Sequence, residues 1–233
     1  MTANKLRYIL LSILCTALIS SCNSDQKKAP ADLTGNAKDS ATAIRPESSA
    51  AVKNILFFGT SLTAGLGVDP DQAYPALIQH KIDSLDLPYK VINAGLSGET
   101  SAAGKSRIDW LLKQQVDVFV LELGANDGLR GLPVKETAAN IQAVIDHVKK
   151  KYPKAKLLLS GMQMPPSMGE KYTSDFKNMF PALAKKNNMT FIPFLLNGVG
   201  GVPKLNQKDG IHPTPEGHKI LAENVWQKLQ GNL

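Results

Sequence analysis

The two residues best suited to catalysis are a serine and a histidine that lie far apart in the sequence. Ser61 stands between glycines in Gly59-Thr60-Ser61-Leu62-Thr63-Ala64-Gly65, where a strand-to-helix turn can expose its hydroxyl. His212 stands in Asp209-Gly210-Ile211-His212-Pro213, where the carboxylate can hold one imidazole nitrogen while the other faces a nucleophile. Taken alone, the serine segment also fits a helix cap or an ordinary turn. Together the two segments could support nucleophilic catalysis.

Two further segments carry groups that could bind a developing negative charge. Residues 93–100 contain Gly98 and residues 124–128 contain Asn126, and each segment follows a predicted strand. Glycine lets the backbone approach a ligand closely, and a backbone N–H or an asparagine amide can donate a hydrogen bond to an anion. Seen alone, each segment also fits a turn that links a strand to a helix.

Other groups that could do chemistry fit structural roles better. His80, His147 and His218 fall within predicted helices and lack a neighbouring carboxylate turn, which favours a surface or structural role. The segment 98–106 has five residues between its glycines, where a phosphate-binding loop has four. The Ser-x-x-Lys pattern at 174–177 lacks a Lys-Thr-Gly partner and falls where a helix is predicted to start.

The elements that position these residues are predicted from an alternation of apolar runs and amphipathic segments. Residues 118–121 show no polar alternation, as expected for a strand that is buried on both faces. Repeated strand-helix units predict the α/β class, with a parallel sheet covered by helices on both sides and ligands bound at the carboxyl ends of its strands. The predicted strands are 54–58, 89–92, 117–123, 156–160 and 190–193, and the predicted helices are 72–83, 100–114, 134–151, 175–187 and 215–230.

The four segments in this order resemble the SGNH (GDSL-type) hydrolases, with Ser61, Gly98, Asn126 and His212 as the namesake residues. The resemblance covers residues 52–230. Three further segments of the chain, 73–77, 121–131 and 180–184, are similar to the thioesterase I, lysophospholipase and arylesterase branch of the family.

This resemblance implies a flavodoxin-like three-layer α/β/α sandwich with a parallel five-stranded sheet. It implies that Ser61 is the nucleophile, that His212 is the base and that Asp209 orients the base. The oxyanion hole would consist of the Ser61 N–H, the Gly98 N–H and the Asn126 side chain. It implies no metal and no organic cofactor.

One departure from the family pattern concerns the residue before the nucleophile. The family's Gly-Asp-Ser-Leu is here Gly-Thr-Ser-Leu, so Thr60 lacks the carboxylate that usually helps to organise the active-site loops. The expected function is still hydrolysis of carboxylic esters or thioesters through an acyl-enzyme, with Leu129, Met164 and Pro165 contacting the substrate. Two alternatives are a carbohydrate acetyl esterase and a catalytically impaired SGNH domain that acts as a binding lipoprotein.

The N-terminus predicts export and attachment of a lipid. Lys5 and Arg7 precede an apolar stretch at 8–19, which is too short for a membrane span and typical of a secretory signal. The segment then ends in Ile-Ser-Ser-Cys, which resembles a bacterial lipoprotein signal. We therefore expect a lipid-anchored protein of the cell envelope, outside the cytoplasm, with a signal peptide at 1–21, a lipidated Cys22 and flexible tether at 22–51, and a hydrolase domain at 52–233.

Composition limits the partners. The 233 residues are 43% hydrophobic and 20% charged, which suits a chain with a sizeable core. The formal charge is +7, but the basic residues are scattered along the sequence, which argues against nucleic-acid binding. With Cys15 removed and Cys22 lipidated, no thiol is left for a disulfide or a cysteine metal site. The expected partners are an acyl ester or lysophospholipid substrate and the membrane, through the lipid anchor; the oligomeric state stays open.

Overall fold

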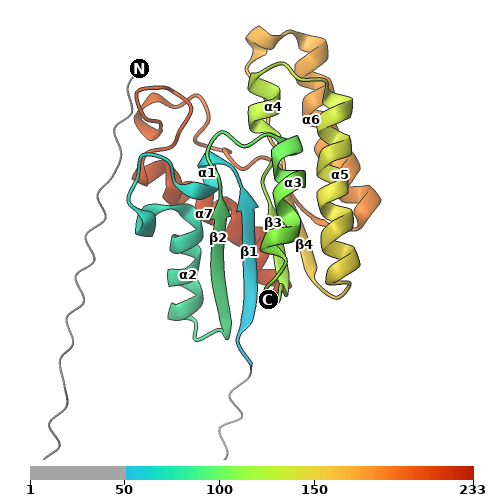
Figure 1. The fold of residues 1–233 in the computed structure, drawn as a ribbon. Helices are drawn as coiled ribbons and strands as arrows, with labels where there is room; N and C mark the ends of the chain where they lie inside the picture. Colours follow the sequence, from blue (N-terminus) through green and yellow to red (C-terminus); the bar gives the residue numbers. More distant parts are fainter. Residues whose placement is uncertain (1–50) are drawn as a thin grey trace, which may run out of the picture. The chain divides into compact units, whose positions relative to one another are not determined.

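A parallel five-stranded sheet forms the centre of residues 51–233, which are the residues that the computed structural model describes (Figure 1). The predicted signal peptide, Cys22 and the predicted tether up to residue 50 lie outside the described residues. The strands follow the spatial order β2-β1-β3-β4-β5. They are β1 (Lys53–Gly59), β2 (Tyr89–Gly95), β3 (Val118–Leu121), β4 (Lys156–Ser160) and β5 (Thr190–Ile192).

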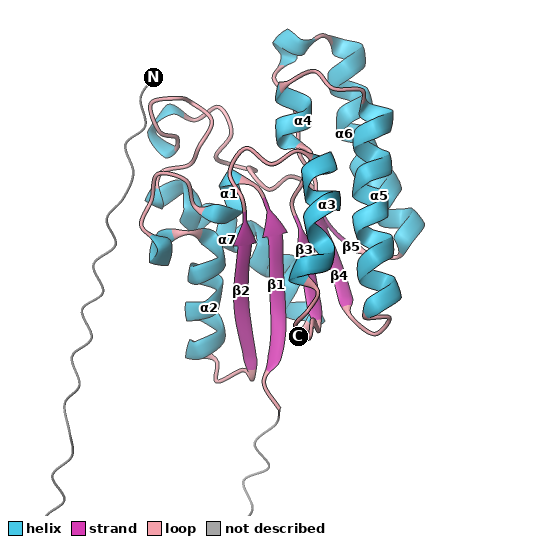
Figure 2. Cartoon of the chain, viewed as in Figure 1, coloured by secondary structure: helices cyan, strands magenta, loops and turns pink. Residues whose placement is uncertain are grey.

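The register of the sheet brings the carboxyl ends of its first three strands to the same level. Gly59 at the end of β1 pairs with Gly95 at the end of β2, and Phe58 pairs with Leu121 at the end of β3. Because all pairings are parallel, the loops that follow these strands leave from one edge of the sheet. This carboxyl edge is where the arrowheads of β1 and β2 point in Figure 2.

Helices cover both faces of the sheet, which gives the predicted three-layer arrangement (Figures 1 and 2). Helices α2 and α7 lie against one face, and α3, α5 and α6 lie against the other. Within residues 51–233, no helix is both long and apolar enough to cross a membrane. The helices are α1 (Ser61–Ala64), α2 (Tyr74–Ser84), α3 (Ser101–Leu111), α4 (Ala125–Leu129), α5 (Val134–Lys151), α6 (Glu170–Asn187) and α7 (Pro215–Leu229).

Local sequence explains where α7 begins and how α5 packs on the sheet. Helix α7 begins with Pro215, whose fixed φ suits a first turn, and Thr214 caps it by accepting the N–H of Gly217 at 3.3 Å. Helix α5 buries one stripe of side chains at helical spacing, from Thr137 to Val148, against the sheet layer. The cap at Thr214 therefore fixes the residue at which the preceding loop ends and α7 begins.

The core is centred on β3, all four residues of which are buried. Phe119 of β3 is fully buried and stacks on Phe58 of β1, with ring centroids 6.0 Å apart. Burial of an aromatic side chain of this size contributes about 2–3 kcal/mol to stability. The carboxyl edge is thus built on the most deeply buried part of the sheet.

The predicted fold class is confirmed, but several element boundaries were wrong, among them those of the third strand and the fourth helix. The third strand was predicted to run to residue 123, whereas β3 ends at Leu121 because the chain turns away at Gly124, whose φ is +103°. The fourth predicted helix was placed at 175–187, whereas α6 begins at Glu170. The Ser-x-x-Lys pattern at 174–177 therefore lies inside a helix, with both of its end residues exposed.

Because β2 lies close to α1 at Gly95, the stability of the protein should be sensitive to a side chain at that position. A Cβ on Gly95 would lie 2.7 Å from the Cα atom of Ala64 and would press on backbone that cannot move aside. We expect Gly95→Ala to lower the free energy of unfolding by about 1–3 kcal/mol in urea titrations. Gly231→Ala is the matched control, because a Cβ there meets no atom within 4 Å. Equal midpoints for the two variants would contradict this packing.

Candidate active site

Ser61, His212 and Asp209 form a continuous chain of hydrogen-bonding side chains at the carboxyl edge. Nε2 of His212 lies 2.9 Å from Oγ of Ser61, and Nδ1 lies 2.6 Å from Oδ2 of Asp209. Ser61 begins α1 directly after β1, whereas Asp209 and His212 belong to the loop before α7. The fold therefore brings together the three residues that the sequence analysis named, although 151 positions separate the serine from the histidine.

Asp209 holds the histidine with both of its oxygens. Oδ1 accepts the backbone N–H groups of Ile211 and His212 at 2.9 and 3.0 Å, while Oδ2 bonds to the imidazole. The bond to the imidazole, followed by the two backbone bonds, holds the pKa of Asp209 well below its usual range. The carboxylate therefore stays ionised at neutral pH and keeps Nε2 of the ring directed at Ser61.

A buried carboxylate directly after β3, that of Glu122, holds the turn that carries Ser61. Glu122 is fully buried, and its Oε2 accepts the N–H of Thr60 at 2.7 Å and the hydroxyl of Thr63 at 2.8 Å. Its Oε1 accepts the hydroxyl of Thr60 at 2.9 Å. Gly59 leaves room for this contact, because a Cβ there would lie 2.6 Å from Oε2. The two threonines flank Ser61, so one carboxylate fixes the turn that carries Ser61 on both sides.

This network changes the meaning of the departure at Thr60. At this position Thr60 lacks the carboxylate that usually helps to organise the active-site loops of the resembled family. In the structure Glu122 supplies a carboxylate and Thr60 donates to it through both its N–H and its hydroxyl. The hydroxyl of Tyr74 lies 2.8 Å from Oγ of Thr63 and extends the network. Burial raises the pKa of Glu122 and of Tyr74, and the three donors on Glu122 partly offset that effect.

The loop that carries Gly98 is tied to the first turn of α4, which carries Asn126. Nδ2 of Asn126 donates to the carbonyl of Glu99 at 3.0 Å, directly beside Gly98. The guanidinium of Arg130, one turn further on, donates to the carbonyl of Gly98 at 3.1 Å. Gly98 has a φ of +78°, a conformation that glycine adopts without strain. The Asn126 amide has two N–H groups, so one is still available to a ligand.

The predicted oxyanion hole consists of three donors on these loops. Within residues 51–233, the backbone N–H groups of Ser61 and Gly98 have no hydrogen-bond acceptor. Together with the second N–H of Asn126, they leave three donors on the loops that follow β1, β2 and β3. Their role in binding an oxyanion stays a prediction, and this geometry is what supports it.

Two further carboxylates that the sequence analysis missed secure the same loops. Glu99 is buried and forms a two-point ion pair with Arg107, with N–O distances of 2.7 and 2.6 Å. Asp127 is buried and accepts the N–H and the hydroxyl of Ser101 at 2.8 and 2.6 Å, which joins the loop after β3 to the start of α3. Only Glu122 offered a signal in the sequence, because it directly follows the apolar run 118–121 and a carboxylate there needs partners when it is buried.

The three predicted substrate-binding residues differ in their surroundings. Leu129 ends α4 with 43% of its surface exposed, and Pro165 is exposed in the loop after β4. Met164 is buried instead, with its sulfur packed against Gly128 of α4. Leu129 and Pro165 are thus accessible, whereas Met164 is part of the core behind them. Contact of these residues with substrate stays a prediction.

The other histidines occupy surface or structural positions. His80 is exposed, and His147 pairs with Asp109 of a neighbouring helix at 2.7 Å. His218 is buried in α7, stacks on Tyr74 and accepts the N–H of Tyr74 on Nδ1 at 3.3 Å. No group of three or more His, Cys, Asp or Glu side chains that could hold a metal ion is found in residues 51–233.

The Glu122 network predicts that its charge matters more than its shape. Glu122→Gln keeps the size but turns an amide N–H toward groups that are themselves donors. We expect it to lower the free energy of unfolding by about 2 kcal/mol and to reduce the activity, because the Ser61 turn loosens. Urea titration beside the exposed Glu136→Gln control measures the first effect. Unchanged stability and activity in Glu122→Gln would contradict the role assigned to this carboxylate.

Buried His218 predicts a dependence of stability on pH. Burial, followed by the charge of His212, lowers the pKa of His218 to about 4. The unfolded chain binds this proton more readily, so stability is complete above about pH 6.5 and declines as the pH falls toward 4. We expect His218→Asn, which retains an acceptor near Nδ1, to show a smaller decline in urea midpoint over that window. An equally steep decline in the variant would assign the effect to other groups.

Comparison with known proteins agrees with this geometry. Residues 57–220 match the GDSL-like Lipase/Acylhydrolase family. The chain is 39% identical over 182 residues to esterase TesA of Pseudomonas aeruginosa, covering 78% of this chain and 90% of that protein. It is 36% identical to thioesterase 1/protease 1/lysophospholipase L1 of Escherichia coli K12, covering 78% and 85%.

Among solved structures, the psychrotrophic esterase EstA from a Pseudoalteromonas species, inhibited by monoethylphosphonate, superposes with a TM-score of 0.73 at 30% identity. The match covers 77% of this chain and 97% of that one. The matched segments include the Ser61 turn, the Gly98 and Asn126 loops and the Asp209–His212 loop, all of which lie within residues 57–220. The chain therefore belongs to the GDSL-like lipase/acylhydrolase family.

Proposed function

We propose that this protein is a serine esterase that hydrolyses carboxylic ester or thioester bonds through an acyl-enzyme. The observation that carries the proposal is the unbroken sequence of contacts from Asp209 through His212 to Ser61, at 2.6 and 2.9 Å. An ionised aspartate, an imidazole and a serine hydroxyl at such distances are the arrangement that activates a serine for attack on a carbonyl.

In the acylation step, Oγ of Ser61 forms a bond to the acyl carbon while His212 takes the hydroxyl proton. The tetrahedral intermediate then collapses, the bond to the leaving alcohol or thiol breaks, and His212 returns the proton to that leaving group. In the second half, His212 takes a proton from water, which attacks the acyl-Ser61 ester and releases the carboxylic acid. Asp209 remains ionised throughout and stabilises the imidazolium each time it forms.

The negative charge on the intermediate needs donors that are in place before the reaction. The N–H groups of Ser61 and Gly98 and the Asn126 amide meet this need, since the loops that carry them are fixed by the buried carboxylates of Glu99 and Glu122. Donors that are held in advance spend no energy on reorganisation during the reaction, and each contributes about 3–4 kcal/mol to lowering the barrier.

The surroundings of the triad support an acyl group with apolar character. Five of the exposed large hydrophobic residues belong to loops or helix ends at the carboxyl edge; they are Leu66, Leu96, Leu129, Leu132 and Ile211. The related proteins bear the names esterase and thioesterase/lysophospholipase. We therefore assign the substrates to aryl or acyl esters, thioesters and lysophospholipids. A carbohydrate acetyl esterase is the alternative, and it would show activity on acetyl groups alone.

We also propose that the protein is an exported lipoprotein of the cell envelope, anchored through Cys22. The support is the sequence of residues 1–22, in which basic residues, an apolar run and Ile-Ser-Ser-Cys follow one another. Residues 23–51 would then be the tether that joins the anchor to the catalytic domain. An impaired binding lipoprotein, the other alternative raised by Thr60, is disfavoured because Thr60 takes part in an intact network around Ser61.

Hydrolysis of p-nitrophenyl esters from acetyl to palmitoyl tests the proposed chemistry. We expect Ser61→Ala to abolish turnover and Asn126→Ala to reduce kcat by about 10²–10³, because one of three oxyanion donors is lost. The exposed Asn178→Ala on α6 is the control for Asn126 and should turn over normally. Full activity in Ser61→Ala would overturn the mechanism, and the chain-length profile would separate an acetyl esterase from an enzyme that acts on longer acyl groups.

A further inference from the structure

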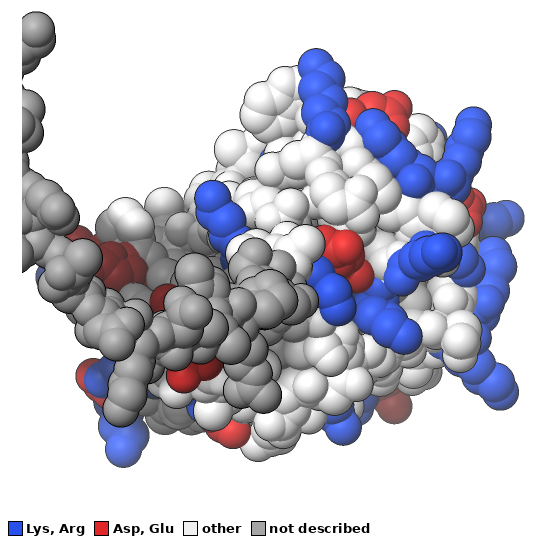
Figure 3. All heavy atoms as spheres, turned by 90° about the horizontal axis from the view of Figure 1, so that it is seen from below, with Lys and Arg blue, Asp and Glu red and all other residues white. Residues whose placement is uncertain are grey.

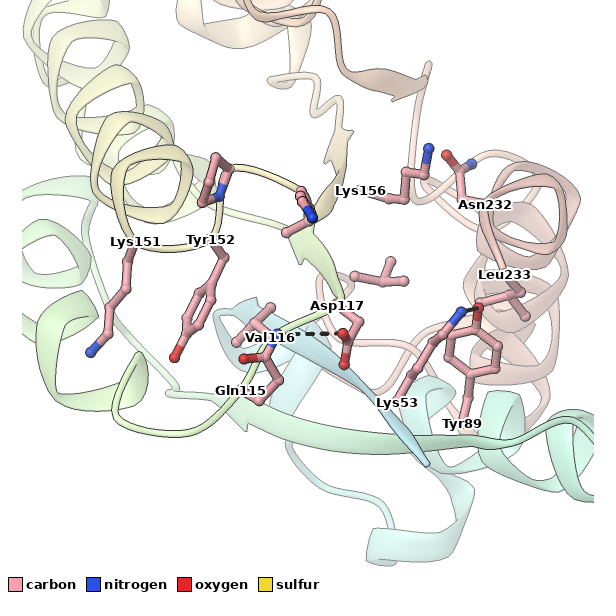
Figure 4. Close-up of a pocket in the computed structure, with 14 residues that line it drawn as sticks. Lys53, Tyr89, Gln115, Val116, Asp117, Lys151, Tyr152, Lys156, Asn232 and Leu233 are labelled. Carbon is pink, nitrogen blue, oxygen red and sulfur yellow. Dashed lines mark hydrogen bonds between the residues drawn. The ribbon is translucent and has the colours of Figure 1, made fainter. Parts of the chain in front are cut away.

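Lysine side chains gather at the edge of the sheet opposite the triad. This edge, where the strands begin, is called the base below, and Figure 3 views the molecule from that side. Two adjoining clefts of about 350 and 720 Å³ open there and share the turn 153–156 between α5 and β4. Figure 4 shows the smaller cleft. The lysines that line the two clefts are Lys53, Lys149, Lys151, Lys154 and Lys156.

These cations are exposed and have no anionic partner among the described residues. All the ion pairs within residues 51–233 involve other cations, and Asp117 is the one acidic side chain that lines either cleft. Asp117 already accepts the backbone N–H of Asn54 at 2.8 Å, and the terminal residue Leu233 lines the same cleft. The clefts therefore carry a positive excess that the described part of the protein does not neutralise.

Helix dipoles account for only part of this concentration. Because every strand-helix unit runs in the same direction, α5 and α6 end at the base, and Lys149–Lys151 and Lys185–Lys186 occupy their last turns. Lys53, Lys154 and Lys156 lie outside the helices: Lys53 and Lys156 begin β1 and β4, and Lys154 lies in the turn between α5 and β4. They add to the positive charge at the helix ends and line the same two clefts, which makes these clefts a candidate site for an anionic ligand.

We propose that the base binds the anionic head groups of a phospholipid bilayer. Three observations favour a lipid surface over a nucleic acid. The lining cations are lysines, which act as point charges toward a charged surface, and no arginine that could grip phosphates at two points lines the clefts. The aromatic rings are not free to stack on bases, because Tyr89 is buried and the Tyr152 hydroxyl bonds to the carbonyls of Leu112 and Gln114.

The third observation is the point at which the proposed tether enters the domain. The tether joins β1 at Lys53, a residue that itself lines the smaller cleft. A lipid on Cys22 would thus keep the base within reach of the membrane that holds the anchor. This step rests on the proposed function and on the proposed anchor, whereas the cationic clefts do not.

Docking of the base would turn the active site away from the bilayer. Strand β1 runs from Lys53 at the base to Gly59 next to the nucleophile turn, which separates the two ends by about 20 Å. Ser61 would then face the aqueous compartment. The enzyme would act on substrates that arrive from solution, rather than on lipids of the membrane that holds it.

Vesicle binding by residues 52–233, without the anchor, tests the proposal. This segment can be studied alone, because EstA, 97% of whose chain is covered by the match, is a folded enzyme of the same extent. We expect co-sedimentation with vesicles of equal parts phosphatidylcholine and phosphatidylglycerol, but not with phosphatidylcholine alone, and release by high salt. The variant that replaces Lys151, Lys154 and Lys156 by Gln should bind about 100-fold more weakly, at about fivefold for each lysine.

The matched control replaces Lys105, Lys135 and Lys177 by Gln, which removes the same charge from exposed sites away from the base. It should bind as the wild type does. Failure of the wild type to bind anionic vesicles, equal losses in both triple variants, or tighter binding to duplex DNA than to the vesicles would each overturn the proposal.

Hydrolysis of a soluble p-nitrophenyl ester, measured on the same samples, keeps this test separate from that of the catalytic function. Both triple variants should retain wild-type turnover in solution, which also shows that they are folded. Vesicle-bound wild type should hydrolyse the soluble ester as fast as free protein, because Ser61 faces the solution. A loss of turnover on binding would contradict the proposed orientation even if the lysines do bind lipid.

Discussion

The architecture of the site depends on one buried carboxylate, that of Glu122. It lies at the end of the most buried strand and accepts three hydrogen bonds from the residues on either side of Ser61. A buried carboxylate without partners would be strongly destabilising, so the turn that satisfies it has little freedom to adopt another conformation. The glycine at position 59 is a consequence of the same contact, because any side chain there would collide with the carboxylate.

Buried carboxylates also fix the neighbouring segments at this edge of the sheet. Glu99 anchors the loop after β2 through Arg107, and Asp127 anchors the loop after β3 to the first turn of α3. Each of these loops starts at the same level of the sheet because the strands are parallel and in register. The backbone therefore determines where the loops begin, and the buried carboxylates determine how they continue. Catalysis by fixed donors requires both.

The sequence alone predicted the fold class, the five strands and the residues that meet at the triad. That was possible because apolar runs report burial directly and because four short motifs occur in a fixed order. It did not predict the ties made by Glu122, Glu99 and Asp127, since a carboxylate in sequence carries no sign of which loop it will meet. Nor did it predict the lysine-lined clefts: four of the five lysines lie within residues 149–156, but the sequence does not show that Lys53 and residues 187–190 lie beside them.

The two edges of the sheet thus have different chemistry. The carboxyl edge carries the triad, the free backbone donors and exposed leucines, while the base carries the start of β1 and lysines that form no ion pair within residues 51–233. The fold separates them by the length of β1. If the base binds a lipid surface as proposed, this separation would leave the carboxyl edge free to receive substrate.

The central claim is that Ser61 is a nucleophile activated by His212, and covalent labelling tests it most directly. The protein is incubated with a serine-reactive phosphonate, and the adduct is located by mass spectrometry of peptides from wild type and from His212→Ala. We predict one adduct on Ser61 in the wild type and none in the variant over the same period. An unlabelled wild type, or an adduct on a different residue, would contradict the account.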